Sequence, residues 1–420
     1  MSGGAKVKKN RKLFTGAALV AALATLGVVQ GYLDKVAAQA KQVPRFEVDP
    51  FWPKPMPNNY VFGQTIGLGI SSDDHVWVIH RGNDTGNLDR TELAFPGGAT
   101  APRVSECCNA APPVMEFDAA GNNVGGWGGP VAGAPYQWPE SNHGIVVDHK
   151  GFVWIGGNGG PDSHILKFTR DGKFVAQYGK PGARKDPASP AEKPVFRSNS
   201  LDMESFGRVA KIFIDPKANE GYVSDGYLNK RVAVIDLDNG KIKRIWGAYG
   251  EPPTDLNLGP YDPTAPLPRQ FRNPMHCAEM SNDGLVYTCD RPNDRVQVFT
   301  TQGKFISEHR IEPQTRSDGS VWDIAFSKDA EQRFLYMADG ANEHVRIFDR
   351  KTMTELYNFG YGGRQPGMFL GVHSIAVDSK GNLYTTETYT GKRLQKFVYK
   401  GLVNVTTDKR GAPWPTKTGN

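Results

Sequence analysis

Apolar and polar residues alternate along this chain in short runs separated by tight polar turns, a pattern typical of β-strands. One unit recurs six times: an apolar strand, a turn rich in Asp, Gly, Lys and Asn, a second strand with an aromatic residue, and a further hairpin. No long amphipathic helical period interrupts these units. The six copies begin near Ile66, His143, Ala210, His276, Trp322 and His373.

The repeated unit predicts the fold. Six units with four short strands each are typical of a β-propeller, in which the first strand of every blade lines a central channel. We therefore expect an all-β, six-bladed β-propeller from residue 41 to residue 405, followed by a surface tail at residues 406–420. The last unit lacks a fourth strand after Phe397, and we expect residues 46–48 to supply it and close the ring.

The first 40 residues differ from the repeats and have the pattern of a targeting segment. Basic residues 6–12 precede an apolar run at residues 13–29, and Ala38-Gln39-Ala40 is a candidate cleavage site. This segment is either a signal peptide or an uncleaved N-terminal membrane anchor. In both cases we expect the propeller to be exported, periplasmic or secreted, and in the second case to be anchored to the inner membrane.

The net charge of +6 comes almost entirely from that segment, because residues 1–40 contain six Lys or Arg and one Asp. The repeats therefore have a net charge of about +1 and lack the clustered basic face that nucleic-acid binding requires. We expect no nucleic-acid partner. The sequence gives no indication of the oligomeric state.

Four cysteines are consistent with an oxidising compartment. Cys277 and Cys289 flank a predicted hairpin turn, so we expect them to face each other across two strands. Cys107 and Cys108 are adjacent and form either a vicinal disulfide or two free thiols. For both pairs the simplest interpretation is a structural role.

Three histidines share one position of the repeat. His143, His276 and His373 each lie 11 residues before the aromatic residue of the second strand, in the second, fourth and sixth units. Equivalent positions on alternate blades are about 120° apart around the channel axis, so the three imidazoles should converge. A single histidine at a strand start is usually structural, but this alternating register is difficult to explain by chance.

Three imidazole ligands with an open fourth position are typical of a catalytic zinc site. We therefore predict a zinc site at one mouth of the channel, although the ligand type also suits other divalent metals. The remaining histidines lie outside the register, and we expect them to be structural: His75, His80, His149, His164, His309 and His344.

Residues that follow the second strand of a blade should lie at the same mouth as the histidines, because the first two strands are antiparallel. Arg81, Tyr227 and Arg291 occupy such positions. The arginines are candidates to bind a carboxylate or stabilise a developing oxyanion, and Tyr227 is a candidate general base if the metal and the arginines lower its pKa. The alternative is that all three form inter-blade hydrogen bonds and ion pairs.

Several motifs resemble the lyase domain of peptidylglycine α-amidating enzymes, a propeller family related to NHL repeats. The resemblance extends over about residues 60–400. It rests on VWVIHRG (76–82), NHG (142–144), SDGYLNKR (224–231), NPMHC (273–277), CDRPNDRVQVF (289–299) and VHSIAVDSKGNLY (372–384).

The resemblance implies a zinc-dependent lyase that cleaves the N–C bond of a C-terminal α-hydroxyglycine and releases a peptide amide and glyoxylate. His143, His276 and His373 would then be the zinc ligands. Arg81 would stabilise substrate oxygens, and Tyr227 would take the proton from the α-hydroxyl group. Arg291 would hold the substrate carboxylate or orient the base.

Two features depart from the family pattern. The family's structural calcium uses an Asp directly after the third histidine, where this chain has Ser374, so calcium is doubtful here. The long segment 83–113 follows Arg81 directly and can reshape the substrate pocket. The substrate is therefore left open between a peptide C-terminus and another small α-hydroxy compound.

Two other functions compete with the lyase. A non-catalytic NHL-type propeller would bind a protein or ligand, and fold alone does not separate it from an enzyme. A lactonase-type propeller hydrolase would hold calcium with acidic and amide side chains. The histidine register favours the lyase over both.

Overall fold

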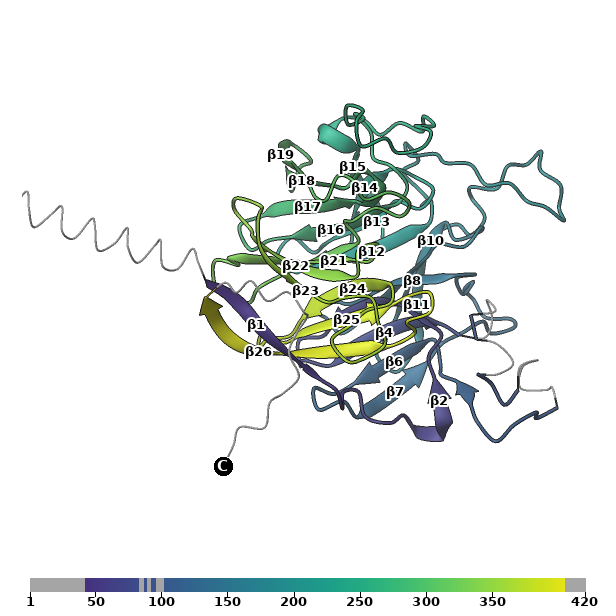
Figure 1. Cartoon of the computed structure of the whole chain (residues 1–420). Coiled ribbons are helices and arrows are strands. Elements are labelled where there is room, and N and C mark those ends of the chain that lie inside the picture. The colour runs from purple at the N-terminus through teal and green to yellow at the C-terminus, as the bar shows by residue number, and fades with distance from the viewer. Residues whose placement is uncertain (1–41, 83–86, 89–91, 96–101, 405–420) are drawn as a thin grey trace, which may run out of the picture.

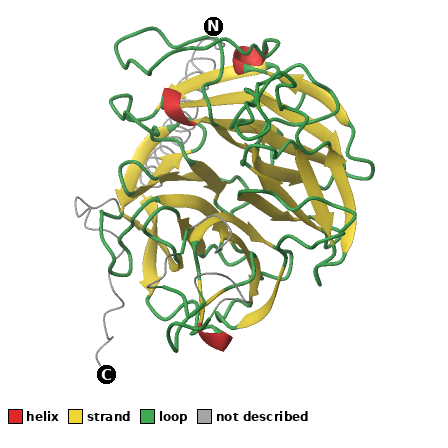
Figure 2. Ribbon diagram, turned by 90° about the vertical axis from the view of Figure 1, so that its right-hand side faces the viewer, coloured by secondary structure: helices red, strands yellow, loops and turns green. Residues whose placement is uncertain are grey.

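The computed structural model describes residues 42–82, 87–88, 92–95 and 102–404. The expected signal peptide or anchor (1–40) and the expected tail (406–420) lie outside the described residues. Within them, the strands form six four-stranded antiparallel sheets and one short two-stranded pair (Figures 1 and 2). The predicted all-β, six-bladed β-propeller is therefore confirmed.

The strands of the first three blades follow one another along the chain. Blade 1 contains β3 (Gln64–Ile70), β4 (Val76–Arg81), β6 (Val114–Phe117) and β7 (Asn123–Trp127). Blade 2 contains β8 (Asn142–Val147), β9 (Val153–Gly157), β10 (His164–Phe168) and β11 (Phe174–Gly179). Blade 3 contains β12 (Val209–Asp215), β13 (Glu220–Asp225), β14 (Arg231–Asp236) and β15 (Ile242–Trp246).

The other three blades complete the ring. Blade 4 contains β16 (Met275–Met280), β17 (Leu285–Asp290), β18 (Arg295–Thr300) and β19 (Phe305–Arg310). Blade 5 contains β20 (Asp323–Phe326), β21 (Phe334–Asp339), β22 (His344–Asp349) and β23 (Thr354–Phe359). Blade 6 contains β24 (Val372–Val377), β25 (Leu383–Glu387), β26 (Leu394–Asn404) and β1 (Gln42–Asp49).

A short strand pair and several 3₁₀ helices lie outside the six blades. The two-stranded pair joins β2 (Tyr60–Val61) to β5 (Asn109–Ala110) in parallel. The described residues include the single-turn 3₁₀ helices η1 (Pro57–Asn59), η3 (Ala248–Gly250) and η4 (Arg291–Asn293). Among the described residues, no helix is both long and apolar enough to cross a membrane.

The sixth blade is closed by the two ends of the described chain. Strand β1 pairs antiparallel with β26, with Phe46 opposite Tyr399 and Val48 opposite Phe397 (Figure 1). The side chain of Phe46 packs in the same core cluster as Phe397. The expectation that residues 46–48 supply the missing fourth strand is therefore confirmed.

The second strand of most blades is buried throughout, because each blade packs between two neighbours. All residues of β9, β13, β21 and β25 are buried. The outer strands, such as β11 and β19, have exposed positions instead. The first strands, β3, β8, β12, β16, β20 and β24, pack against one another around the channel.

Both cysteine pairs form disulfides. Cys277 on β16 is bonded to Cys289 on β17, as the hairpin predicts, and both residues are fully buried. Cys107 and Cys108 form a vicinal disulfide, which selects one of the two alternatives that the sequence left open.

Candidate metal centre

The three histidines of the shared register meet in the channel. His143 lies on β8, His276 on β16 and His373 on β24, and all three are buried. One ligand atom from each lies within 4.8 Å of the others, and the ring centroids are 4.8–5.1 Å apart. A single metal ion can contact all three at this spacing.

Each histidine sits where its strand breaks register with the neighbouring strand. In β8, Asn142 pairs with Gly157 but Ile145 already pairs with Ile155, so an extra residue is accommodated between them. The same shift occurs between Met275 and Ala278 in β16 and between Val372 and Ile375 in β24. A β-bulge re-aims a side chain, and here the bulges contain the three imidazoles that meet in the channel.

The hydrogen bonds of the Nδ1 atoms determine the tautomer of each imidazole. His143 Nδ1 donates to the carbonyl of Ala210 (2.7 Å), and His276 Nδ1 donates to the carbonyl of Trp322 (2.5 Å). His373 Nδ1 lies 3.2 Å from Ser374 Oγ. Because that hydroxyl donates its own proton to the Ile66 carbonyl, it accepts from His373.

All three Nε2 atoms are therefore unprotonated, and each carries a lone pair that a metal can bind in place of a hydrogen-bond donor. Burial, followed by neighbouring charged groups, holds the pKa values of the three imidazoles well below their usual range, so the rings are neutral. Neutral imidazoles whose second nitrogen donates to a carbonyl or hydroxyl are typical of metal-binding histidines. The donor set thus fits a divalent metal such as zinc.

Tyr227 lies directly against this cluster. Its hydroxyl is 2.9 Å from His143 Nε2 and 3.0 Å from His276 Nε2. The preceding residue, Gly226, allows this approach, because a Cβ atom there would lie 1.9 Å from the carbonyl oxygen of Met275. Burial raises the pKa of the Tyr227 phenol, and the charges of Arg291 and Arg81 partly offset that effect.

Arg81 lies at the end of β4 at the same mouth. Its guanidinium donates to Asn158 Oδ1 (2.9 Å) and Gln64 Oε1 (3.2 Å), and its Nε donates to the Asn142 carbonyl (3.3 Å). Among the described residues, no carboxylate forms an ion pair with it. Its positive charge is therefore available to an anionic ligand.

Arg291 begins η4 on the other side of Tyr227. Its guanidinium carbon lies 4.4 Å from the centre of the Trp322 ring and 6.0 Å from that of Tyr227. The contact with Asp318 is long, at 3.5 Å, and the buried Nε has no hydrogen-bond partner among the described residues. The structure thus brings together all six residues that the sequence singled out.

Three neighbours of this mouth were not predicted. Gln64 lies opposite Arg81 in the pairing of β3 with β4, so the strand register was a usable signal. Tyr389 follows the end of β25 and donates to Asp318 Oδ2 (2.7 Å), and its place after a second strand was also a usable signal. Asp318 lies in a loop before β20, and no repeat position identifies it.

A second ionic cluster lies deeper in the channel. The Lys211 ammonium contacts Asp323 Oδ1 (2.7 Å) and Oδ2 (2.9 Å) and Glu279 Oε1 (2.9 Å). Between this cluster and the histidines is a cavity of only about 10 Å³, lined by His143, His276 and Ser374 among others. Beyond Lys211 the opposite mouth opens into a cavity of about 590 Å³.

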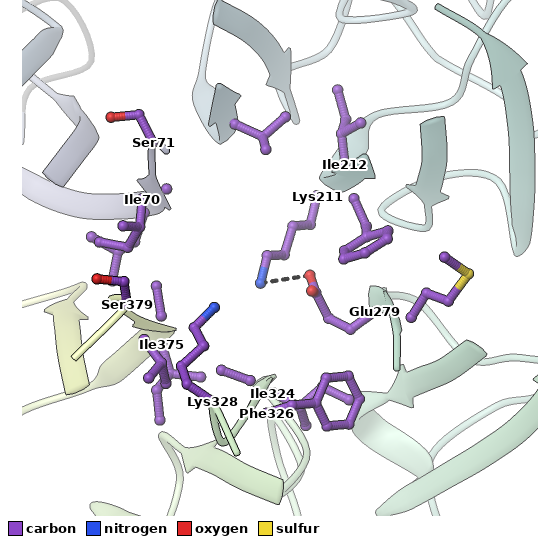
Figure 3. A pocket seen from close by; sticks show the side chains of 18 of the residues that line it. Ile70, Ser71, Lys211, Ile212, Glu279, Ile324, Phe326, Lys328, Ile375 and Ser379 are labelled. Carbon is purple, nitrogen blue, oxygen red and sulfur yellow. Dashed lines mark ion pairs between the residues drawn. The ribbon is translucent and has the colours of Figure 1, made fainter. Parts of the chain in front are cut away.

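Figure 3 shows this opposite cavity, with the Lys211 side chain pointing to the Glu279 carboxylate and apolar side chains such as Ile212 and Phe326 around them. Burial lowers the pKa of Lys211, but the two carboxylates outweigh it and the net shift is upward. The ammonium is therefore charged and separates the two ends of the channel. The ionic cluster therefore lies between the histidines and this opposite cavity.

Ser374 occupies the position at which the amidating lyases use an Asp for calcium. Its hydroxyl donates to the Ile66 carbonyl (2.7 Å), and its backbone N–H donates to Thr386 Oγ1 (3.0 Å). The hydroxyl is thus part of the hydrogen bonds that hold His373. Calcium stays a doubtful expectation.

Sequence comparisons support the resemblance that the motifs indicate. No family model matches the chain. Peptidyl-glycine alpha-amidating monooxygenase B of Xenopus laevis is 25% identical over 267 residues, which is 62% of this chain, and form A is 24% identical over the same length. The chain spans about a quarter of the length of these relatives. It is therefore similar to the amidating enzymes, as predicted.

Solved structures with a similar shape include a streptogramin B lyase (TM-score 0.47, 13% identity, 84% of this chain and 98% of that one). A virginiamycin B lyase from Staphylococcus aureus is also similar (TM-score 0.45, 11% identity, 80% and 94%).

Proposed function

We propose that this protein is an exported zinc-dependent lyase that breaks the C–N bond of an α-hydroxy amide of the N-acyl-α-hydroxyglycine type. One observation carries the proposal: three neutral imidazoles converge with unprotonated Nε2 atoms beside a tyrosine and two arginines. A scaffold for protein binding has no need of such a cluster. The similarity to amidating enzymes supports the same reaction class.

The proposed zinc ligands are His143, His276 and His373. A bound zinc ion would act as a Lewis acid at the substrate hydroxyl and lower its pKa. Among the described residues, this is the only group of at least three His, Cys, Asp or Glu side chains with metal-binding spacing. That favours the histidine-based lyase over a lactonase-type hydrolase.

The proposed reaction is a balanced elimination. With its pKa lowered by a bound zinc ion and the two arginines, Tyr227 Oη would act as the phenolate that takes the proton of the α-hydroxyl group, and the O–H electron pair forms the new C=O bond. The C–N bond breaks, and its electron pair is protonated on nitrogen as Tyr227 returns the proton. The products are an amide and glyoxylate, and no oxidant or reductant is consumed.

The two arginines supply charge at this mouth. Arg81, which has no carboxylate partner among the described residues, would stabilise the negative charge that develops on the substrate oxygen. Arg291 would hold the carboxylate of the hydroxyglycine, since its contact with Asp318 is long enough to be replaced. Both arginines also offset the effect of burial on the Tyr227 pKa.

Export is part of the proposal. The two disulfides are consistent with an oxidising compartment, periplasmic or extracellular. Cleavage or retention of residues 1–40, and hence anchoring to the inner membrane, can be read from the N-terminus of the mature protein.

Metal analysis and turnover test the proposal together. We expect about one zinc per chain after purification without chelators, and loss of that zinc in His276→Ala. The matched control is His309→Ala, because His309 lies on the outer strand β19. N-acetyl-α-hydroxyglycine should release glyoxylate with the zinc-loaded protein. A metal-free protein, or no glyoxylate from the zinc form, would contradict the proposal.

A further inference from the structure

A cleft of about 340 Å³ opens beside Arg291, away from the histidines. It lies between the loop that precedes β16, the helix η4 and the loop that precedes β20. Three basic side chains line it: Lys230, Arg272 and Arg291. The one acidic residue in its lining is Asp318. Its volume suits a small ligand group rather than a folded partner.

The charges of Lys230 and Arg272 are not neutralised within the protein. Lys230 Nζ donates to the Leu256 carbonyl (2.6 Å), and Arg272 Nε donates to Asn293 Oδ1 (3.0 Å). Among the described residues, neither side chain forms an ion pair with a carboxylate. Burial lowers the pKa of both groups, as expected for cations that have lost water and gained neutral hydrogen-bond partners but no carboxylate.

The nearby carboxylates are engaged elsewhere. Asp290 forms a buried ion pair with Arg295 (2.6 Å). Asp255 accepts hydrogen bonds from the backbone and hydroxyl of Ser200 (3.0 and 2.6 Å), and its charge acts on Lys230 without forming an ion pair with it. Asp318 accepts from Tyr389 and makes only the long contact with Arg291. With three cations against Asp318 and Asp255, the cleft has an excess of positive charge.

Arg291 connects this cleft to the proposed reaction centre. Its guanidinium faces Tyr227 on one side, and the residue lines the cleft on the other. Pro292 and Asn273 continue the same wall, and Asn273 Nδ2 donates to the Gly226 carbonyl next to Tyr227 (2.6 Å). A group bound in the cleft therefore lies beside the reacting part of the substrate.

We propose that this cleft binds a second anionic group of the substrate, on the acyl side of the C–N bond that breaks. The substrate class is then an N-acyl-α-hydroxyglycine whose acyl part ends in a carboxylate, with Lys230 and Arg272 as its specificity-determining residues. This inference rests on the proposed lyase function. Charge-assisted hydrogen bonds to two cations distinguish such a substrate from a neutral one.

The test compares N-succinyl-α-hydroxyglycine with N-acetyl-α-hydroxyglycine, which differ by the added carboxylate arm. We expect kcat/KM to be at least about tenfold higher for the succinyl compound. The ratio should fall to about one in Lys230→Met and in Arg272→Met. The control Lys304→Met, at an exposed turn of blade 4, should keep the ratio of the parent protein. Equal kcat/KM values for the two compounds with the parent protein would overturn the assignment.

Binding separates this inference from the proposed function. If neither compound is cleaved, the lyase assignment fails, and the cleft is then tested by calorimetry with the stable compounds N-succinylglycine and N-acetylglycine. At least tenfold tighter binding of the succinyl compound, lost in Arg272→Met, supports the anion cleft by itself. Equal affinities overturn it. Thermal unfolding of each variant shows whether it is folded.

Discussion

The hydroxyl oxygen of Tyr227 lies 2.9 Å from Nε2 of His143, although the two residues are 84 positions apart and belong to adjacent blades. The contact places an acid–base group against the imidazole nitrogen that would bind the metal. It therefore joins the proposed metal site to the proposed proton transfer.

Replacement of this phenol tests its role in proton transfer. We expect Tyr227→Phe to lower kcat for N-acetyl-α-hydroxyglycine by about 10²–10⁴-fold, the usual contribution of a general base. Zinc content should stay near that of the parent protein, since the three imidazoles are retained. The control is Tyr178→Phe on the outer strand β11. Unchanged kcat in Tyr227→Phe would exclude a catalytic role.

Replacement of Lys211 tests how much the ionic cluster in the channel contributes to stability. Lys211→Met leaves the Asp323 and Glu279 carboxylates without their cation, and we expect it to reduce the free energy of unfolding by about 3–5 kcal/mol. Adding Asp323→Asn and Glu279→Gln should restore most of that loss. Lys328→Met, at the exposed rim of the same cavity, is the control. Denaturant unfolding measures the free energy of unfolding of Lys211→Met, of the triple variant and of Lys328→Met. An unchanged free energy of unfolding in Lys211→Met would contradict the interpretation.

The buried carboxyl of Asp294 should make the stability of the protein depend on pH. Burial raises the pKa of this carboxyl to about 7. Its Oδ1 accepts from the Ser320 N–H (2.8 Å), while Oδ2 is buried without a donor among the described residues. The folded protein thus binds this proton more tightly than the unfolded chain, so its stability falls as pH rises from about 4 to 7.

Asp294→Asn removes that titration. Asparagine also tolerates the left-handed backbone at this position, where φ is 51°. We expect the variant to have a higher Tm than the parent protein at pH 8, with a smaller difference at pH 5. Glu331→Gln, at an exposed carboxylate, should show no such trend. A constant Tm difference across this pH range would be evidence against a raised pKa.

The buried disulfide of β16 and β17 is expected to stabilise the fold. It closes a loop with a sequence separation of 12 residues, and a loop of this size contributes about 3 kcal/mol in the chain-entropy description. Cys277→Ala combined with Cys289→Ala should therefore lower the free energy of unfolding by roughly that amount. Zinc content should be measured as well, because Cys277 directly follows His276. The Cys107–Cys108 disulfide joins adjacent residues and closes no long loop. Cys107→Ala combined with Cys108→Ala should therefore lower the free energy of unfolding much less.

Much of this fold was predictable because the repeat is a property of the sequence alone. Six similar units required six similar blades, and the missing strand after Phe397 had an obvious donor at residues 46–48. The convergence of His143, His276 and His373 also followed from their register, since equivalent positions of a propeller are related by rotation. The resemblance to amidating enzymes rested on the same positions.

The loops were less predictable, because no repeat relates one loop to another. Asp318 could not be identified as a neighbour of Arg291, and neither could Arg272 and Lys230 as the walls of one cleft. The pairing of Lys211 with Asp323 and Glu279 joins three blades, and each residue by itself looks like an ordinary surface charge.

The sequence by itself determined the number of blades, the closure of the ring and the three histidine positions, because these depend on spacing along the chain. The tertiary structure decided which nitrogen of each imidazole is unprotonated, how Tyr227 approaches it, and which cations have no carboxylate partner among the described residues. Those features depend on atoms from different blades lying within about 3 Å of one another, a distance that hydrogen bonds require. The order of residues along the chain does not specify these distances.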